Sequence, residues 1–142
     1  MRFQLVSLSG VKFDDEVAEV TLPTRSGEIG VLSNHMPLVS VASHGRIAVR
    51  YKASDPDDFR DFFAISGGAV EVENNTLRVL VDEADHADEI NEAEVQEAIE
   101  LATKMKADAK DQHSLDQAQQ IIDRQSVRLQ VAGLKRRSRR GN

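Results

Sequence analysis

Residues 70–81 read V-E-V-E-N-N-T-L-R-V-L-V, and this stretch decides how the first part of the chain is interpreted. Its apolar residues alternate with polar ones on both sides of a polar centre: Val70 and Val72 before it, and Leu77, Val79 and Val81 after it. That period of two is typical of half-buried β-strands. Asn74-Asn75 separates the two runs, and Asn tolerates the positive φ of a tight hairpin turn. The stretch therefore predicts two antiparallel strands joined by a short turn.

Shorter runs of the same kind precede this hairpin. They lie at residues 3–6, at residues 17–22, which end before Pro23, and at Ile47, Val49 and Tyr51. A further turn is expected across residues 54–58. Many short strands with frequent turn signals are typical of an antiparallel sandwich or barrel. Residues 1–81 are therefore expected to form a β-sandwich domain that folds by itself.

The pattern of apolar and polar residues changes after Val81. Residues 82–89 read D-E-A-D-H-A-D-E, a polar stretch without periodicity that we interpret as a linker. Residues 90–142 then carry helical signals, including two N-terminal capping patterns, N-x-x-E at Asn91 and S-x-x-Q at Ser114. These patterns predict two helices that meet near residues 111–113 and fold back as an antiparallel hairpin.

Apolar residues recur at helical spacing in both predicted helices. They are Ile90, Ala93, Ala98, Leu101, Ala102 and Met105 in the first, and Leu115, Ala118, Ile122, Leu129 and Ala132 in the second. These stripes are thin and rich in Ala, so the hairpin should be marginally stable alone. Residues 82–111 carry 3 basic and 11 acidic side chains, whereas residues 112–142 carry 7 and 2. The opposite charges favour pairing of the two arms, although each exposed ion pair contributes little.

The composition excludes several kinds of site. The chain has no Cys, so it holds neither a disulfide nor a Cys-based metal centre. Its four His show no metal-ligand spacing: His35, His44, His86 and His113. A phosphate-binding G-x-x-x-x-G-K-[ST] motif and a nucleophile elbow are both absent from the sequence. We therefore expect no catalytic residue, no metal and no cofactor.

Membrane insertion is not expected either. No stretch of the sequence approaches the roughly 20 apolar residues that span a bilayer. Residues 1–9 contain a single basic residue and lack the apolar centre of a signal peptide. If the protein acts at a membrane, we expect other proteins to hold it there.

Three motifs carry a resemblance to a known family. Residues 27–38, G-E-I-G-V-L-S-N-H-M-P-L, are similar to the G-E-x-G and H-x-P-L segment of the ε subunits of rotary F-type ATP synthases, called δ in mitochondria. Residues 66–72, S-G-G-A-V-E-V, resemble that family's S-G-G-x-x-E-V. Gly45 stands before the strand at Ile47 as in the family's P-G-x-I motif, with His44 in place of Pro. The resemblance implies an antiparallel β-sandwich of about ten strands, followed by the C-terminal two-helix hairpin.

The resemblance also implies a role. It describes a non-catalytic central-stalk subunit that links the γ shaft to the ring of c subunits, and it assigns this interface to Glu28, Ile29, Gly30, His35 and Pro37. Close backbone approach or a tight turn would explain the glycines of the same motifs: Gly27, Gly30, Gly67 and Gly68. The residues alone also allow a plainer interpretation, in which Glu28 is an exposed loop charge and His35 makes structural hydrogen bonds.

The second helix is the regulatory element that the resemblance implies. In the family it can extend along the shaft, meet the catalytic β and α subunits and block ATP hydrolysis. The basic residues suited to such a contact are Arg124, Arg128, Lys135, Arg136, Arg137, Arg139 and Arg140. Some relatives bind ATP on the hairpin through a pattern like I-D-x-x-R-A and two later Arg. Residues 90–95 here read I-N-E-A-E-V, so only Arg124 and Arg128 match, and we expect weak or no ATP binding.

Two other functions remain open from the residues. One is a small β-sandwich ligand-binding module with a helical interaction arm, although aromatic residues, which carbohydrate platforms use, are 4 % of the chain. The other is a nucleic-acid-binding accessory protein that uses the basic C-terminal run, which a sequence pI near 5.2 opposes. The resemblance instead implies a peripheral protein on the cytoplasmic face of a bacterial plasma membrane, within an ATP synthase and bound to no nucleic acid.

Overall fold

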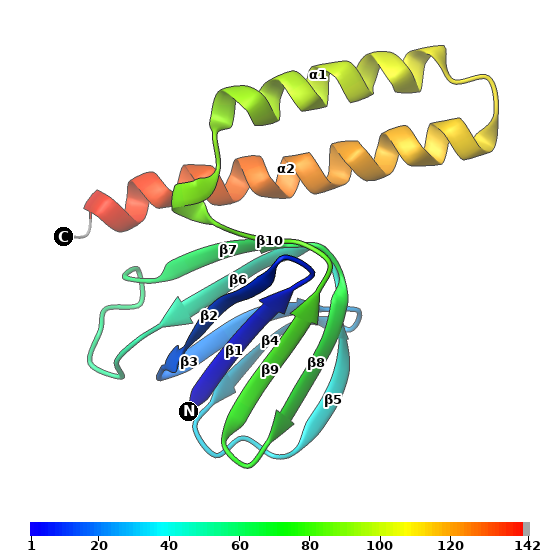
Figure 1. Ribbon diagram of the computed structural model, residues 1–142. Coiled ribbons are helices and arrows are strands. Elements are labelled where there is room, and N and C mark those ends of the chain that lie inside the picture. Colours follow the sequence, from blue (N-terminus) through cyan, green and yellow to red (C-terminus); the bar gives the residue numbers. More distant parts are fainter. Residues whose placement is uncertain (141–142) are drawn as a thin grey trace.

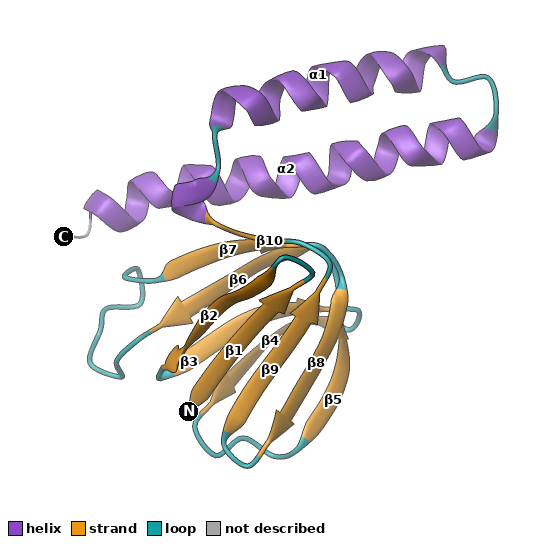
Figure 2. Cartoon of the chain, viewed as in Figure 1, coloured by secondary structure: helices purple, strands orange, loops and turns teal. Residues whose placement is uncertain are grey.

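The computed structural model describes the backbone of residues 1–140 and the side chains up to Leu134 (Figures 1 and 2). Ten strands come first: β1 (Arg2–Ser7), β2 (Gly10–Glu16), β3 (Glu19–Thr24), β4 (Gly27–Leu32), β5 (Leu38–Ala42), β6 (Gly45–Arg50), β7 (Asp61–Ile65), β8 (Gly68–Glu73), β9 (Thr76–Val81) and β10 (Ala84–His86). A 3-10 helix, η1 (Ala87–Glu89), leads to α1 (Glu92–Asp108) and α2 (Gln112–Arg140). The predicted order of a β-sandwich followed by a helical hairpin is confirmed.

The strands form one folded sheet whose ends approach each other. The hydrogen-bonded order is β10-β7-β6-β3-β5-β8-β9-β1-β2, and β4 pairs with β3 outside this path. β10 also lies close to β1 and β2. Neighbouring strands are antiparallel except β1 and β9, which run parallel with Phe3 opposite Leu77. The predicted antiparallel sandwich is thus corrected at one pair, because alternation sets the face of a side chain and not the direction of its partner strand.

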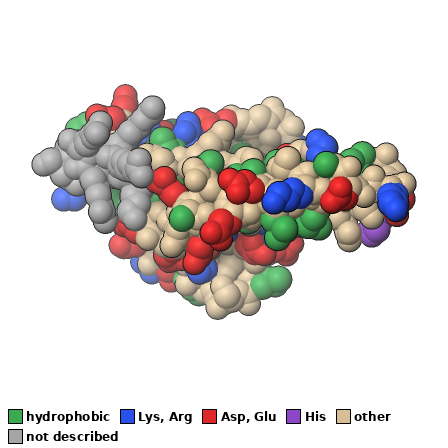
Figure 3. Space-filling view, turned by 90° about the horizontal axis from the view of Figure 1, so that it is seen from above, with side chains coloured by type: hydrophobic (Ala, Val, Ile, Leu, Met, Phe, Trp, Pro, Cys, Tyr) green, Lys and Arg blue, Asp and Glu red, His purple; other side chains and the backbone are tan. Residues whose placement is uncertain are grey.

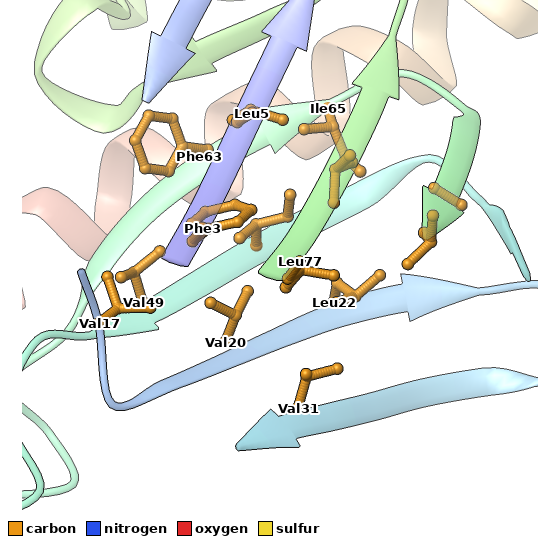
Figure 4. Close-up of a cluster of buried hydrophobic side chains, with 14 of the residues drawn as sticks. Phe3, Leu5, Val17, Val20, Leu22, Val31, Val49, Phe63, Ile65 and Leu77 are labelled. Carbon is orange, nitrogen blue, oxygen red and sulfur yellow. The ribbon is translucent and has the colours of Figure 1, made fainter. Parts of the chain in front are cut away.

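The core lies between the two layers of this sheet. Figure 4 shows Phe3 and Leu5 of β1 and Leu77 of β9 lying close to Leu22 of β3 and Phe63 of β7. All five side chains are at most 2 % exposed. Burying a side chain of this size contributes about 1.5–3 kcal/mol. Aliphatic and Phe side chains therefore supply most of the stability of the sandwich.

The predicted hairpin at residues 70–81 is β8 and β9. Leu77, Val79 and Val81 are buried and alternate with exposed residues. Asn74 and Asn75 have φ of 52° and 57°, as the turn requires. At the start of β8, a Cβ on Gly68 would lie 1.9 Å from the Leu80 carbonyl oxygen. Glycine at position 68 is therefore what lets β8 approach β9 so closely.

The segment predicted as a linker, residues 82–89, has regular structure. Residues Ala84–His86 form β10, which pairs antiparallel with β7, and η1 follows directly. The Ser66 amide donates to the Glu83 carbonyl oxygen at 3.0 Å, and the Glu83 amide donates to Ser66 Oγ at 2.9 Å. The β layer thus continues beyond Val81, and the expected boundary at residue 81 falls inside it.

The helix caps agree with the prediction for one helix and correct it for the other. Asn91 Oδ1 accepts hydrogen bonds from the amides of Ala93 and Glu94, so the predicted cap of α1 is confirmed. α2, however, begins at Gln112, and Asp111 Oδ1 accepts the Ser114 amide hydrogen at 2.7 Å. Asp111, and not Ser114, therefore caps α2.

The predicted apolar stripes mix two helix faces. In α1, Val95 and Ala102 are buried, whereas Leu101 and Met105 are 62 % and 45 % exposed. In α2, Ala118 is fully buried. α1 packs on α2, and α2 packs on β7 and the edge of β6. The two helices therefore contact each other through smaller residues than the sequence suggested.

Candidate functional site

Residues 27–38, which carry the main family motif, form β4 and the loop that follows it. Gly27 has φ of +117°, a conformation that side chains disfavour, and its carbonyl oxygen accepts a hydrogen bond from Thr24 Oγ1 at 2.6 Å. A Cβ on Gly30 would meet no atom within 4 Å. A Cβ on Gly67 would lie 3.1 Å from the Ala42 carbonyl oxygen. The positive φ thus explains glycine at position 27, and the nearby Ala42 carbonyl leaves little room for a side chain at position 67. Nothing in the fold requires glycine at position 30.

The residues predicted as one interface lie at two separate places. Glu28 stands near the start of β4, and His35 and Pro37 follow its end, with about 13 Å of strand between Glu28 and Leu32. Glu28 is exposed and lines a cavity of about 660 Å³. Ile29 points inward and packs against the sandwich core. The predicted set therefore divides into Glu28 at one end of β4 and the loop of residues 33–37 at the other.

The loop of residues 33–37 is held by polar contacts within the loop and with the β8–β9 turn. The His35 ring Nδ1 lies 2.8 Å from the Met36 carbonyl oxygen, which fits a structural histidine. The Asn34 amide donates to Asn75 Oδ1 at 2.7 Å and ties this loop to the β8–β9 turn. Met36 is 76 % exposed. These contacts present Met36 and Pro37 at the end of the sandwich.

An apolar row crosses the outer surface of five neighbouring strands. The strand registers place its members side by side, in the order Val41, Ala69, Leu80, Val6 and Val11. Val41, Leu80 and Val11 are 48 %, 46 % and 66 % exposed. Such a contiguous exposed row is typical of a surface that binds another protein. We call these five residues the apolar row.

The apolar row was not predicted from the sequence, although one signal was present. Residues 79–81 read V-L-V, so one of three consecutive apolar residues had to face outward. The row also needs two pairings between strands that are distant in sequence, β5 with β8 and β9 with β1. Pairing information was therefore needed to bring them together.

A second surface joins the hairpin to the sandwich. Its buried members are mostly small: Ala64, Ala87, Ile90, Val95, Val131 and Ala132. Phe62 of β7 and Val127 of α2 pack at its margin. We call these six buried residues the hairpin contact. Because its side chains are small, this contact buries less apolar surface than the core of the sandwich.

Ion pairs flank the hairpin contact. Arg124 Nη1 lies 3.3 Å from Glu83 Oε1, and Arg128 Nε lies 3.2 Å from Asp85 Oδ2. The two arginines that the sequence analysis assigned to an external partner thus contact the protein's own sandwich. The side chains of the other predicted basic residues lie outside the described part of the chain: Lys135, Arg136, Arg137, Arg139 and Arg140.

Ion pairs join the oppositely charged segments of residues 82–111 and 112–142, as their charges predicted: Arg124 pairs with Glu83, and Arg128 pairs with Asp85. Both acidic residues precede α1. One polar contact between the two helices themselves is a hydrogen bond from Lys106 Nζ to Gln119 Oε1 at 2.6 Å. Viewed from above, the outer surface of the hairpin shows acidic and basic side chains interspersed with hydrophobic ones (Figure 3).

Two polar clusters strengthen the sandwich. Glu19 pairs with Arg50 at 2.7 Å and with Arg60 at 3.4 Å. Partial burial opposes ionisation of Glu19, but the hydrogen bond from Arg50 and the charge of Arg60 outweigh it and lower the pKa of this carboxyl. Asp61 accepts a hydrogen bond from Tyr51 at 2.8 Å and also contacts His86 Nε2. Burial, and then the contact with Asp61, raise the pKa of Tyr51.

These clusters connect strands and do not form a recognisable catalytic centre. The Glu19 cluster joins β3 to β6, and the Asp61 cluster joins β7, β10 and the segment that follows β6. Among the described side chains, residues 1–134, no group of three or more His, Asp or Glu is arranged to hold a metal ion. Within residues 1–140, no helix is long and apolar enough to cross a membrane.

The β-sandwich carries an exposed apolar row and a small-residue contact for a helical hairpin, and surfaces of this kind are typical of a protein that binds other proteins. The chain belongs to the delta/epsilon chain family of ATP synthases, because the model of that family's β-sandwich domain matches residues 1–87. It is 34 % identical over 137 residues to the ATP synthase epsilon chain of Herpetosiphon aurantiacus, with 96 % of each chain covered. It is 32 % identical over 133 residues to that of Gloeobacter violaceus, covering 94 % of this chain and 97 % of the relative.

Solved structures show the same fold. A chain in a cryo-EM structure of the Euglena gracilis mitochondrial ATP synthase, comprising OSCP, F1 and the c-ring, has a TM-score of 0.76 at 25 % identity, covering 92 % of this chain and 79 % of that chain. A chain of the Tetrahymena thermophila central stalk and c-ring has a TM-score of 0.54 at 14 % identity, covering 97 % and 96 %. The likeness to the Tetrahymena chain supports the fold alone.

Proposed function

We propose that this chain is a non-catalytic central-stalk subunit that joins the γ shaft to the c-ring of a proton-translocating ATP synthase. The observation that carries the proposal is the coverage of ATP synthase epsilon chains over nearly their whole length, sandwich and hairpin together. The Euglena relative lies in an assembly that contains F1 and the c-ring. This membership replaces both alternatives that the sequence left open, the ligand-binding module and the nucleic-acid-binding protein.

The apolar row is the proposed surface for the γ subunit. The row runs without a break across five strands, and three of its residues are 46–66 % exposed. Burial of this apolar surface by a partner would contribute about 25 cal/mol per Å². The loop of residues 33–37 lies beyond the end of β4, and we propose that Met36 and Pro37 in this loop extend the contact with γ.

Glu28 is the proposed contact for the c-ring. It is exposed at the opposite end of β4 from His35, near the turn formed around Gly27. A carboxylate in this position suits the polar loops of a membrane ring better than an apolar shaft. Replacing Glu28 with Lys should weaken ATP-driven proton pumping in reconstituted vesicles while the isolated subunit stays folded. Pumping that is unchanged would remove Glu28 from the interface.

The hairpin is the proposed brake on ATP hydrolysis. Its second helix carries Arg124, Arg128 and the basic run of residues 135–140, which suit acidic surfaces of the catalytic β and α subunits. In a bacterial cell, the subunit would lie peripherally on the cytoplasmic face of the plasma membrane. Deleting residues 112–142 should raise ATP hydrolysis by the assembled enzyme. Equal rates with and without these residues would show that the hairpin is no brake.

Native co-purification tests the central-stalk assignment. Leu80→Asp places a charge in the middle of the apolar row and should reduce recovery of γ and c subunits at least about tenfold, because a buried unpaired carboxylate costs several kcal/mol. Leu101→Asp makes the same change at an exposed hairpin residue and is the matched control. Full recovery of both partners with Leu80→Asp would show that γ does not bind at the apolar row. Failure of the unaltered chain to recover either partner would refute the central-stalk role itself.

A further inference from the structure

The acidic segment of residues 82–89 has a position that its composition did not suggest. It was interpreted as a solvated linker, yet it lies against the sandwich and directly beneath α2 (Figure 1). Its carboxylates Glu83 and Asp85 pair with Arg124 and Arg128. We propose that Glu83 and Asp85 form a latch that holds the hairpin closed and keeps both arginines from any external partner. The proposal rests on the regulatory role proposed for the hairpin.

The two carboxylates stand on an ordered backbone. Asp85 lies in the middle of β10, opposite Ala64 of β7. The Glu83 carbonyl oxygen accepts hydrogen bonds from both the amide and the hydroxyl of Ser66, at 3.0 and 3.3 Å. Ser66 itself is 7 % exposed. Because the backbone of Glu83 and Asp85 is already fixed, closing the hairpin costs little additional entropy at the acidic side.

The two arginines act together because of their spacing. Positions 124 and 128 are four residues apart, so they share one face of α2. Each guanidinium is committed to its own carboxylate, and Arg128 Nη1 also donates to Gln125 Oε1 at 3.0 Å. A guanidinium held against Glu83 or Asp85 already has part of its charge neutralised, so it binds an acidic surface of another subunit less tightly. Release of the hairpin therefore exposes both charges in one step.

The hydrogen bonding of the latch is incomplete, as expected for an element that must also open. The Nε atoms of Arg124 and Arg128 are buried and make no hydrogen bond with the described residues, although Arg128 Nε lies within ion-pair distance of Asp85. A buried donor without a partner reduces the gain from forming an interface. The Arg124–Glu83 pair is also 41 % and 54 % exposed, whereas the Arg128–Asp85 pair is 27 % and 29 % exposed. Asp85 should therefore contribute more to the latch than Glu83.

Thiol labelling of the isolated full chain measures how often the hairpin lifts. The chain has no Cys, so Ala132→Cys places a single thiol in the hairpin contact, where Ala132 is 1 % exposed. In this background, the labelling rate follows the population of the open form. Glu83→Gln and Asp85→Asn should each raise the rate about two- to fivefold, as expected for partly exposed ion pairs. Asp82→Asn, which removes the adjacent charge, should leave the rate unchanged.

A charge exchange separates the ion pair from a general effect on folding. Asp85→Arg alone should speed labelling strongly, and adding Arg128→Asp should return the rate toward that of the starting protein. Equal rates for Asp82→Asn, Glu83→Gln and Asp85→Asn would overturn the latch, and so would failure of the exchange to restore slow labelling. The readout needs no other subunit, so it stands apart from any failure of the proposed brake on ATP hydrolysis.

Discussion

Replacing Val131 with Ala should loosen the hairpin while the sandwich stays folded. Val131 is fully buried in the hairpin contact. The substitution removes two methyl-sized groups, a loss of about 1.6 kcal/mol at about 0.8 kcal/mol each. The higher helix propensity of Ala returns about 0.5 kcal/mol. The net cost of about 1 kcal/mol corresponds to about a fivefold larger population of the detached hairpin.

Amide hydrogen exchange of the full chain measures this change. A detached hairpin is marginally stable, so amides of α1 and α2 should exchange about fivefold faster in Val131→Ala, with β1 and β9 unaffected. Val79→Ala is the matched control, because it deletes the same groups from a fully buried site in the sandwich. It should speed exchange in the strands. Equal acceleration of helices and strands by Val131→Ala would refute the reasoning and show one cooperative unit.

Three further predictions follow from single contacts. Gly68→Ala places a Cβ 1.9 Å from the Leu80 carbonyl oxygen and should cost about 3 kcal/mol in urea unfolding, whereas Gly133→Ala, with no atom within 4 Å, should not destabilise. The hydrogen bond from the Ser114 amide lowers the pKa of Asp111. The Asp111 cap therefore stabilises α2 fully above the ordinary Asp pKa, and this stabilisation is lost as pH falls through the lowered pKa. Asp111→Ala should abolish this acid dependence of helix content, measured by circular dichroism. The raised pKa of Tyr51 contributes stability that is lost as pH rises above about 10, so Tyr51→Phe should flatten the alkaline decline in melting temperature.

Local patterns predicted the parts of the fold that depend on local physics. The alternation at residues 77–81 and the positive φ of Asn74 and Asn75 follow from side-chain period and turn chemistry. The parallel pairing of β1 with β9 depends on which strands meet in space, and nothing in either strand encodes it. β10 is three residues long and contains no alternating apolar run, so β7 decides its conformation and its own sequence does not.

The helices show where periodicity alone fails. Leu101 and Ala102 are adjacent in sequence, and a stripe that contains both spans two faces of α1. The structure buries Ala102 at 1 % exposure and leaves Leu101 at 62 %, since close approach of α1 and α2 favours the smaller residue. Likewise, Asp111 and Ser114 are both good capping residues three positions apart. α1 ends at Asp108 and α2 begins at Gln112, so Asp111 is the residue that directly precedes α2 and caps it.

The uneven charge of the chain predicted an attraction between residues 82–111 and residues 112–142, and two ion pairs join these segments. Charge counting did not predict where they lie: Arg124 and Arg128 pair with Glu83 and Asp85, which precede the two helices. Their position matters for regulation. Charges paired between the two helices would travel together when the hairpin moves, and would bias neither position. Charges paired across the junction are broken by the same movement that exposes the arginines, so closure and any contact with a partner become competing states of one equilibrium.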